Sequence, residues 1–148
     1  MALKASTGLR SKLLDTNPLK TIFAAGFIKM YAGTVPATAD DAIPGGATLV
    51  NTISINSTGT GINFDTAAVA GTLSKAPAEV WSGVNAATAT VTFYRHVAVG
   101  DDGTLSTTQA RLQGTIGTAG ADMNLSSVNL TNGATQTVDY YSVTQPTL

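Results

Sequence analysis

Hydrophobic residues recur at helical spacing at the start of the chain and at strand spacing after about residue 26. In the first part, Leu9, Leu13 and Leu14 stand at i, i+4 and i+5, which places them on one side of a helix. Ser6 and Thr7 precede this stripe, and both are residue types that cap helix N-termini. The pattern therefore predicts a short helix that begins at one of these two residues.

A second short helix is predicted after Pro18, because proline is favoured in the first turn of a helix. This helix would run through Leu19 and Ile22. Helices this short are marginal in isolation and need a surface to lie on. We therefore expect residues 1–25 to form a helical N-terminal arm that rests either on the chain's own body or on a partner.

From residue 26 onward the chain is rich in Thr, Val, Ile and Ala, with frequent Gly, Asn, Asp and Pro, as expected of short strands joined by turns. The clearest predicted strand covers residues 87–99, where apolar and polar positions alternate. Arg95 interrupts the apolar side of this alternation. His96 lies on the polar side, which predicts an exposed histidine.

A β-hairpin is predicted near the C-terminus, with arms at residues 123–131 and 134–143. They would be joined by Asn132-Gly133, a preferred pair for a type I′ turn because both positions need positive φ. A bulge near Ser126-Ser127 would correct a slip in the apolar phase of the first arm. Weaker strands are predicted at residues 27–31, 48–55, 61–65, 69–73, 79–82 and 111–116, and residues 34–46 would be a long loop. Strands this numerous predict a mostly β domain over residues 26–148, either a β-sandwich or a jelly-roll-like fold.

Composition adds a charge asymmetry to this picture. Charged residues make up only 11% of the 148 residues, compared with roughly 25% in an average domain. Five of the eight basic residues and one of the nine acidic residues lie in the first 29 positions, which gives that segment a net charge of +4 and the remainder −5. A basic arm on an acidic body favours an acidic protein partner. The arm has no arginine cluster and few aromatic residues, so we do not expect nucleic acid.

Nor do we expect a membrane protein, because no apolar run approaches the ~20 residues that span a bilayer. Residues 21–28 are apolar and follow basic residues, as in a signal peptide. Lys29 ends this run and Asp15 lies in the basic region, so we expect mature structure here. The absence of cysteine favours assembly inside a reducing cell.

The residues that could carry catalysis do not form a convincing set. The chain has no cysteine and one histidine, His96, which excludes thiolate chemistry and cysteine-based metal sites. The pairs Asp40-Asp41 and Asp101-Asp102 lack the alternating ligands of a calcium loop and suit turns. The glycine-rich segments 58–61 and 117–120 lack the other residues of nucleotide-binding motifs. We therefore expect no enzymatic activity, cofactor or metal.

Interface residues are the remaining candidates for function. The first helix offers leucines beside basic side chains, Trp81 is the sole tryptophan, and Arg95 sits on an apolar strand face where it must pair, reach solvent or meet another subunit. For Trp81, a half-buried position in the core or at its rim is the alternative. The candidate protein-interface residues are Leu9, Arg10, Lys12, Leu13, Leu14, Lys20, Trp81 and Arg95.

Five segments together carry a family resemblance: MALKASTGLR (residues 1–10), KLLD (12–15), IKMYAGTVP (28–36), SKAPAEVWSG (74–83) and GTIGTAGAD (114–122). They resemble the cement or head-decoration proteins of tailed bacteriophages, and the resemblance runs over nearly the whole chain. It implies a jelly-roll-like β fold, binding to a major capsid protein with the HK97-like fold, and a homodimer or other symmetric homo-oligomer. It also implies a place on the capsid surface of the virion after assembly in the host cytoplasm.

Two other functions stay open at this point. One is a carbohydrate-binding or adhesion module, in which Trp81, Tyr94, Tyr140 or Tyr141 would stack on sugars. The other is a different virion component, such as a tail or neck protein. A cement protein would act by binding alone, adding adhesive contacts between capsid subunits.

Overall fold

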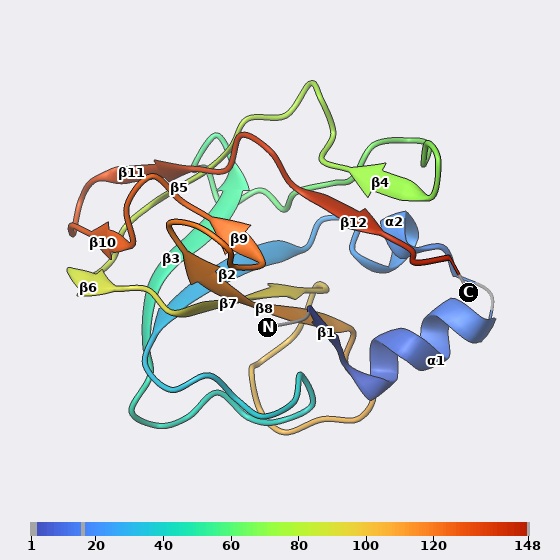
Figure 1. Cartoon of the computed structure of the whole chain (residues 1–148), viewed down its shortest axis with the longest axis horizontal. Coiled ribbons are helices and arrows are strands. Elements are labelled where there is room, and N and C mark those ends of the chain that lie inside the picture. The colour runs from blue at the N-terminus through green and yellow to red at the C-terminus, as the bar shows by residue number, and fades with distance from the viewer. Residues whose placement is uncertain (1–2, 16, 148) are drawn as a thin grey trace.

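An antiparallel sheet with the strand order β1-β8-β7-β2-β3-β5-β11 organises the fold (Figure 1). The fold is taken from a computed structural model, which describes residues 3–15 and 17–147. A short strand, β9 (Met123–Asn124), adds to β8 in parallel. The strands of the main sheet are β1 (Lys4–Ala5), β2 (Phe27–Ala32), β3 (Thr48–Ile55), β5 (Trp81–Val84), β7 (Phe93–Val97), β8 (Arg111–Gly117) and β11 (Thr135–Thr137).

Two small antiparallel strand pairs lie outside this sheet. One joins β4 (Thr72–Ser74) to β12 (Ser142–Thr144), and the other joins β6 (Ala89–Thr90) to β10 (Asn129–Leu130). In Figure 1 the first pair lies above the right side of the sheet and the second at its left end. The chain is thus a mostly β, sandwich-like single domain, and the predicted fold class is confirmed.

Two helices occupy the N-terminal segment, α1 (Thr7–Asp15) and α2 (Leu19–Ile22), as the sequence predicts. Ser6 is the residue that caps α1, since its Oγ accepts a hydrogen bond from the backbone N–H of Leu9 at 3.1 Å. The segment also contributes to the body, because β1 pairs with β8 and the side chain of Leu9 is buried in the core.

Side chains of the central strands alternate between two covered layers. Ile28, His96 and Leu112 stand opposite one another across β2, β7 and β8, and they face the main core. The buried hydrophobic cluster on this side includes Phe23, Ile28, Met30, Val50, Ile53, Ile62, Phe64, Trp81, Tyr94, Leu112, Met123, Val138 and Tyr141.

The other face of the central strands carries polar and basic side chains beside the buried Phe93 and Val97, and it is covered as well. Lys29, Arg95 and Gln113 stand opposite one another there. Arg95 and Gln113 donate hydrogen bonds to carbonyls of the loop 33–47, at Thr38 and Pro36. This loop and the loop 98–110 lie below the sheet in the view of Figure 1. Both faces of β7 are therefore buried.

Several local predictions were wrong, including the strand at residues 61–65, where only the isolated bridges of Ile62 and Phe64 form. The strand predicted over residues 87–99 is divided at residues 91–92 into β6, which pairs with β10, and β7, which pairs with β2 and β8. A turn does form at Asn132-Gly133, but only Gly133 has a positive φ (84°), and the segments on either side pair with different strands. His96 is buried, with 1% of its surface exposed.

Candidate functional surfaces

The end of α1 is the most exposed apolar feature of the N-terminal segment. Within this helix Gly8 and Leu9 are buried, whereas residues 10–15 are exposed. Leu14 exposes 88% of its surface and Leu13 exposes 41%. Arg10 and Lys12 lie in the same exposed stretch, and α1 extends away from the sheet in Figure 1. We call Arg10, Lys12, Leu13 and Leu14 the α1 surface.

The first turn of α1 is held firmly against the body. The Ser6 hydroxyl donates to the carbonyl of Gln109 at 2.7 Å and accepts from the backbone N–H of Arg111 at 2.9 Å, in addition to capping the helix. Gly8 packs so closely that a Cβ there would lie 2.4 Å from the carbonyl carbon of Thr108. These contacts fix the first turn of α1 on the body, and the exposed end of the helix projects from that turn.

Asp40 adds a contact from the loop 33–47. Its carboxylate accepts hydrogen bonds from the backbone N–H and the hydroxyl of Thr7, at 2.8 and 2.6 Å. Burial acts to raise the pKa of Asp40, but these two bonds and the positive charges of Arg10 and Arg111 outweigh it and lower the pKa. An ionised carboxylate at the start of a helix also interacts favourably with the helix dipole.

The eight candidate interface residues divide into two groups. Arg10, Lys12, Leu13, Leu14 and Lys20 are exposed. The ammonium of Lys20 donates to the carbonyl of Thr66, which holds α2 near the turn that precedes β4. By contrast, Leu9, Trp81 and Arg95 each expose about 1% of their surface and pack inside the chain.

Trp81 is a core residue with a satisfied indole. Its Nε1 donates to the carboxylate of Glu79 at 2.7 Å, and its ring lies 6.3 Å from that of Phe64 in an edge-on arrangement. The same carboxylate accepts two bonds from Asn63, and the Lys75 ammonium lies 5.7 Å from the indole centroid. No period-two pattern surrounds Trp81 in residues 74–83, so the depth of its burial could not be predicted from its neighbours.

Arg111 and Asp101 form a buried ion pair beneath the sheet. The guanidinium Nε and Nη2 donate to the two carboxylate oxygens of Asp101 at 2.5 and 2.9 Å, and neither side chain is exposed. Further N–H groups of Arg111 donate to the carbonyls of Ala39 and Thr104 at 3.3 and 2.7 Å. One arginine thus ties the loops 33–47 and 98–110 to β8.

Arg95 lies beside this pair. Its Nε donates to Gln113 Oε1 at 2.8 Å, while Nη1 has no partner among the described residues. Burial lowers the pKa of Arg95 to about 10, and the positive charge of Arg111 adds to the effect. The group stays protonated at neutral pH. It holds the loop 33–47 in place rather than offering a charge at the surface.

His96 sits in an aromatic cage between the layers. Its ring centroid lies 4.4 Å from that of Phe23, 5.3 Å from Phe64 and 5.5 Å from Tyr141. Neither ring nitrogen has a hydrogen-bond partner among residues 3–15 and 17–147. Burial lowers the pKa of His96 to about 3, so the imidazole is neutral in the folded protein near neutral pH.

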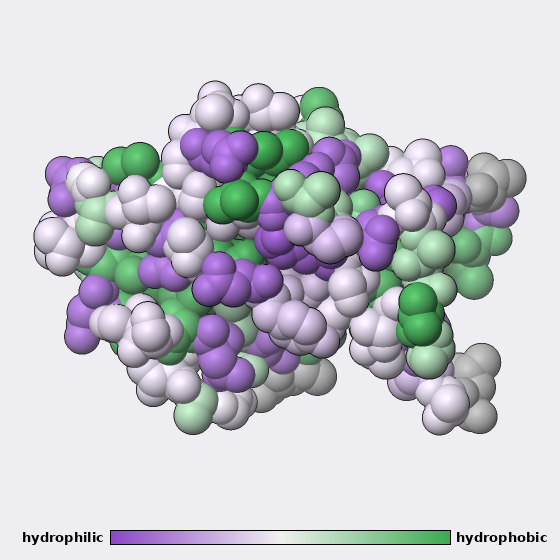
Figure 2. All heavy atoms as spheres, turned by 90° about the horizontal axis from the view of Figure 1, so that it is seen from above, coloured by the Kyte–Doolittle hydropathy of each residue, from purple (hydrophilic) through white to green (hydrophobic). Residues whose placement is uncertain are grey.

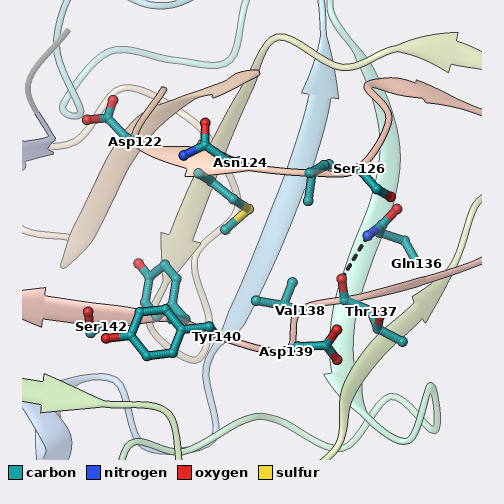
Figure 3. A pocket seen from close by; sticks show the side chains of 12 residues that line it. Asp122, Asn124, Ser126, Gln136, Thr137, Val138, Asp139, Tyr140 and Ser142 are labelled. Carbon is teal, nitrogen blue, oxygen red and sulfur yellow. Dashed lines mark hydrogen bonds between the residues drawn. The ribbon is translucent and has the colours of Figure 1, made fainter. Parts of the chain in front are cut away.

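A cleft of about 480 Å³ opens between β9 and the segment that joins β11 to β12 (Figure 3). We call it the C-terminal cleft. Asp122, Asn124 and Ser126 line one side, and residues 136–142 line the other. Its floor is apolar, with buried Met123, Leu125, Val138 and Tyr141. Tyr140 stands at this cleft with 80% of its surface exposed. Figure 2 shows the face that carries this region, where apolar side chains are exposed between polar ones.

Comparison of the chain with protein-family models, with curated proteins and with solved structures found no match. Within the described ranges, no three His, Asp or Glu side chains are grouped closely enough to hold a metal ion. None of the helices in that part of the chain has the length and apolar character needed to cross a membrane.

Proposed function

We propose that this protein is a cement or decoration protein of a tailed-bacteriophage capsid, which binds the major capsid protein and stabilises the head without catalysis. The observation that supports it most is the α1 surface, an exposed pair of leucines beside basic side chains on a mostly β body. The sequence resemblance to head-decoration proteins points to the same function.

The α1 surface sets the chemistry of the partner. Leu13 and Leu14 require an apolar depression, and burying one leucine side chain contributes about 2 kcal/mol. Arg10 and Lys12 require acidic groups around that depression, and complementary charge mainly favours fast and specific encounter. An acidic rim around an apolar pocket, repeated on each capsid subunit, meets both requirements.

Binding of this kind stabilises a shell by mass action, because a ligand that binds only the assembled lattice opposes its disruption. A modest contact for each copy is sufficient if the protein is a homodimer or another symmetric oligomer. Two linked contacts on neighbouring subunits raise the overall avidity far above the affinity of one contact. Light scattering after size-exclusion chromatography tests this part, and a monomer at all concentrations would remove the oligomer from the proposal.

Removing residues 1–25 is a poor test, because Leu9 and Phe23 belong to the core. A surface substitution is sharper. We expect Leu14→Asp to abolish co-sedimentation with capsids while the variant keeps the thermal unfolding curve of the original protein. Leu105→Asp is the matched control, since Leu105 is also a leucine, exposes 70% of its surface and lies outside α1. Equal binding by all three proteins would refute the α1 surface as the anchor.

A second experiment tests the function itself. Phage heads that carry the protein are compared with heads that lack it in a heat-rupture assay, which follows the release of DNA. We expect heads without the protein to rupture at a lower temperature and the addition of purified protein to restore the higher value. Identical rupture temperatures would refute the stabilising role. Detection of the protein only in purified tails or necks would move it to another virion component.

A further inference from the structure

We propose that the C-terminal cleft binds a neutral sugar, as a site distinct from the α1 surface. The cleft has about the volume of known small-molecule sites, which span roughly 300–1,000 Å³. It also combines the two features that such sites share, an apolar floor and a few polar groups at the sides.

Tyr140 supplies the stacking surface. Tyr140 exposes 80% of its surface, although large aromatic side chains contribute most to stability when they are buried. A sugar ring presents C–H groups on one face and hydroxyls at its edge, so it can cover an exposed tyrosine while its hydroxyls stay hydrogen-bonded. Trp81, Tyr94 and Tyr141 are buried and cannot play this part. Of the four aromatic residues considered for stacking, the fold leaves Tyr140 at the surface.

Hydrogen-bonding groups line both sides of the cleft (Figure 3). Asn124 and Ser126 lie across from Asp139 and Ser142. Within the described chain no side-chain hydrogen bond engages Asp139, Ser142 or the Tyr140 hydroxyl. Carboxylate, amide and hydroxyl groups together offer the acceptors and donors that a polyol requires.

The charge of the cleft selects among ligands. None of the described residues that line it is Lys, Arg or His, so it has no cation to bind a phosphate, a sulfate or an acidic sugar. Its two carboxylates are not equivalent, because Asp122 already accepts bonds from the Thr115 backbone N–H and hydroxyl at 2.8 and 3.0 Å. The Asp139 carboxylate has no hydrogen-bond partner among the described residues. One open carboxylate beside amide and hydroxyl groups fits an uncharged, hydroxyl-rich ring.

The test uses the intact protein, labelled with ¹⁵N, and two kinds of probe. The first is a printed array of neutral, sialylated and sulfated oligosaccharides. The second is a set of methyl glycosides of glucose, galactose, mannose and N-acetylglucosamine, each added to about 50 mM, which saturates a site with a Kd of about 1 mM. We expect binding to neutral glycans, with amide shifts confined to residues 122–126 and 136–142.

Three variants assign that binding to the cleft. Tyr140→Ala removes the stacking ring and should weaken binding about tenfold, as loss of one aromatic contact predicts. Tyr140→Phe keeps the ring and should bind within about twofold. Leu105→Ala, on the loop 98–110, should leave binding unchanged.

The inference is overturned by any of three results: no shift in the cleft with any glycoside and no array signal, binding of sulfated or sialylated glycans alone, or neutral binding that survives Tyr140→Ala. Shifts in the cleft caused by lysine or arginine methyl esters and by none of the sugars would also overturn it in favour of a cationic ligand. These results do not depend on whether the protein binds a capsid.

Discussion

His96 should make the folded protein sensitive to acid. Its pKa is about 3 in the fold, compared with 6.5 for an accessible histidine. Because the folded-state pKa is the lower one, the unfolded chain takes up a proton first as the pH falls. The contribution of His96 to stability is therefore constant above about pH 6.5, declines as the pH falls from there, and levels off near pH 3.

The size of the effect follows from the two pKa values. A difference of one pKa unit corresponds to about 1.4 kcal/mol, so a difference of about 3.5 units corresponds to about 5 kcal/mol over the whole range. At pH 5 the loss is already about 2 kcal/mol. This is a large share of the roughly 5–15 kcal/mol that stabilises a typical domain.

Urea titrations at pH 7.5, 6, 5 and 4 measure this loss directly. Trp81 is the sole tryptophan and lies in the same core, so its fluorescence reports unfolding. The comparison is with His96→Phe and His96→Met, which fill the aromatic cage without a titratable group. Carboxylates such as Asp40 titrate in all three proteins, so their contribution cancels in the difference. We expect wild type to lose about 1.4 kcal/mol per pH unit more than the variants below pH 6. Parallel curves for the three proteins would refute the reasoning.

Three further predictions concern the base of α1 and the layer beneath the sheet. Ser6→Ala removes a helix cap and also the hydroxyl that pairs with the buried Arg111 N–H and the partly buried Gln109 carbonyl, so urea denaturation should show a loss of about 2–4 kcal/mol. Gly8→Ala places a methyl group against the Thr108 carbonyl and should cost about 1–3 kcal/mol, with faster proteolysis at α1 than in wild type. Asp101→Ala leaves Arg111 as an uncompensated buried charge and should cost about 3–5 kcal/mol. Hydrogen exchange should then accelerate in the loops 33–47 and 98–110, and unchanged exchange there would contradict the tie between them.

Local chemistry in the sequence predicted local structure well. Ser6 lies where a helix cap is needed, and Pro18 precedes the second helix, because these residue types act on their immediate neighbours. Strand positions at residues 27–31, 48–55 and 111–116 also agree with the structure, since runs rich in Thr, Val and Ile between turn-forming residues favour strands.

What the sequence missed depends on contacts between distant residues. The alternation at residues 93–97 predicts a strand with an apolar and a polar side, but it does not predict that loops cover the side that carries Arg95. The polar residues on the same side of the alternation predict an exposed His96, whereas Arg95 is an interface candidate because it interrupts the apolar side. Both are buried because residues 33–47 cover one face of β7 and the aromatic core covers the other. The C-terminal cleft lies between β9 and residues 136–142, and no residue pattern in the sequence predicts that these two segments lie side by side.

The attachment of the N-terminus has a consequence for synthesis. Lys4 pairs with Gln113, and the Ser6 hydroxyl accepts a hydrogen bond from the backbone N–H of Arg111. The partner of β1 is therefore synthesised more than 100 residues after β1 itself. At the usual pace of a ribosome, that delay is on the order of ten seconds. During it, α1 and its leucines have no β8 to dock on, and β1 can pair only after β8 has been made. Pairing over such a separation slows folding. We therefore expect the N-terminal segment to acquire protection after β2 and β3, which pair over a shorter separation, in a pulse-labelled folding experiment.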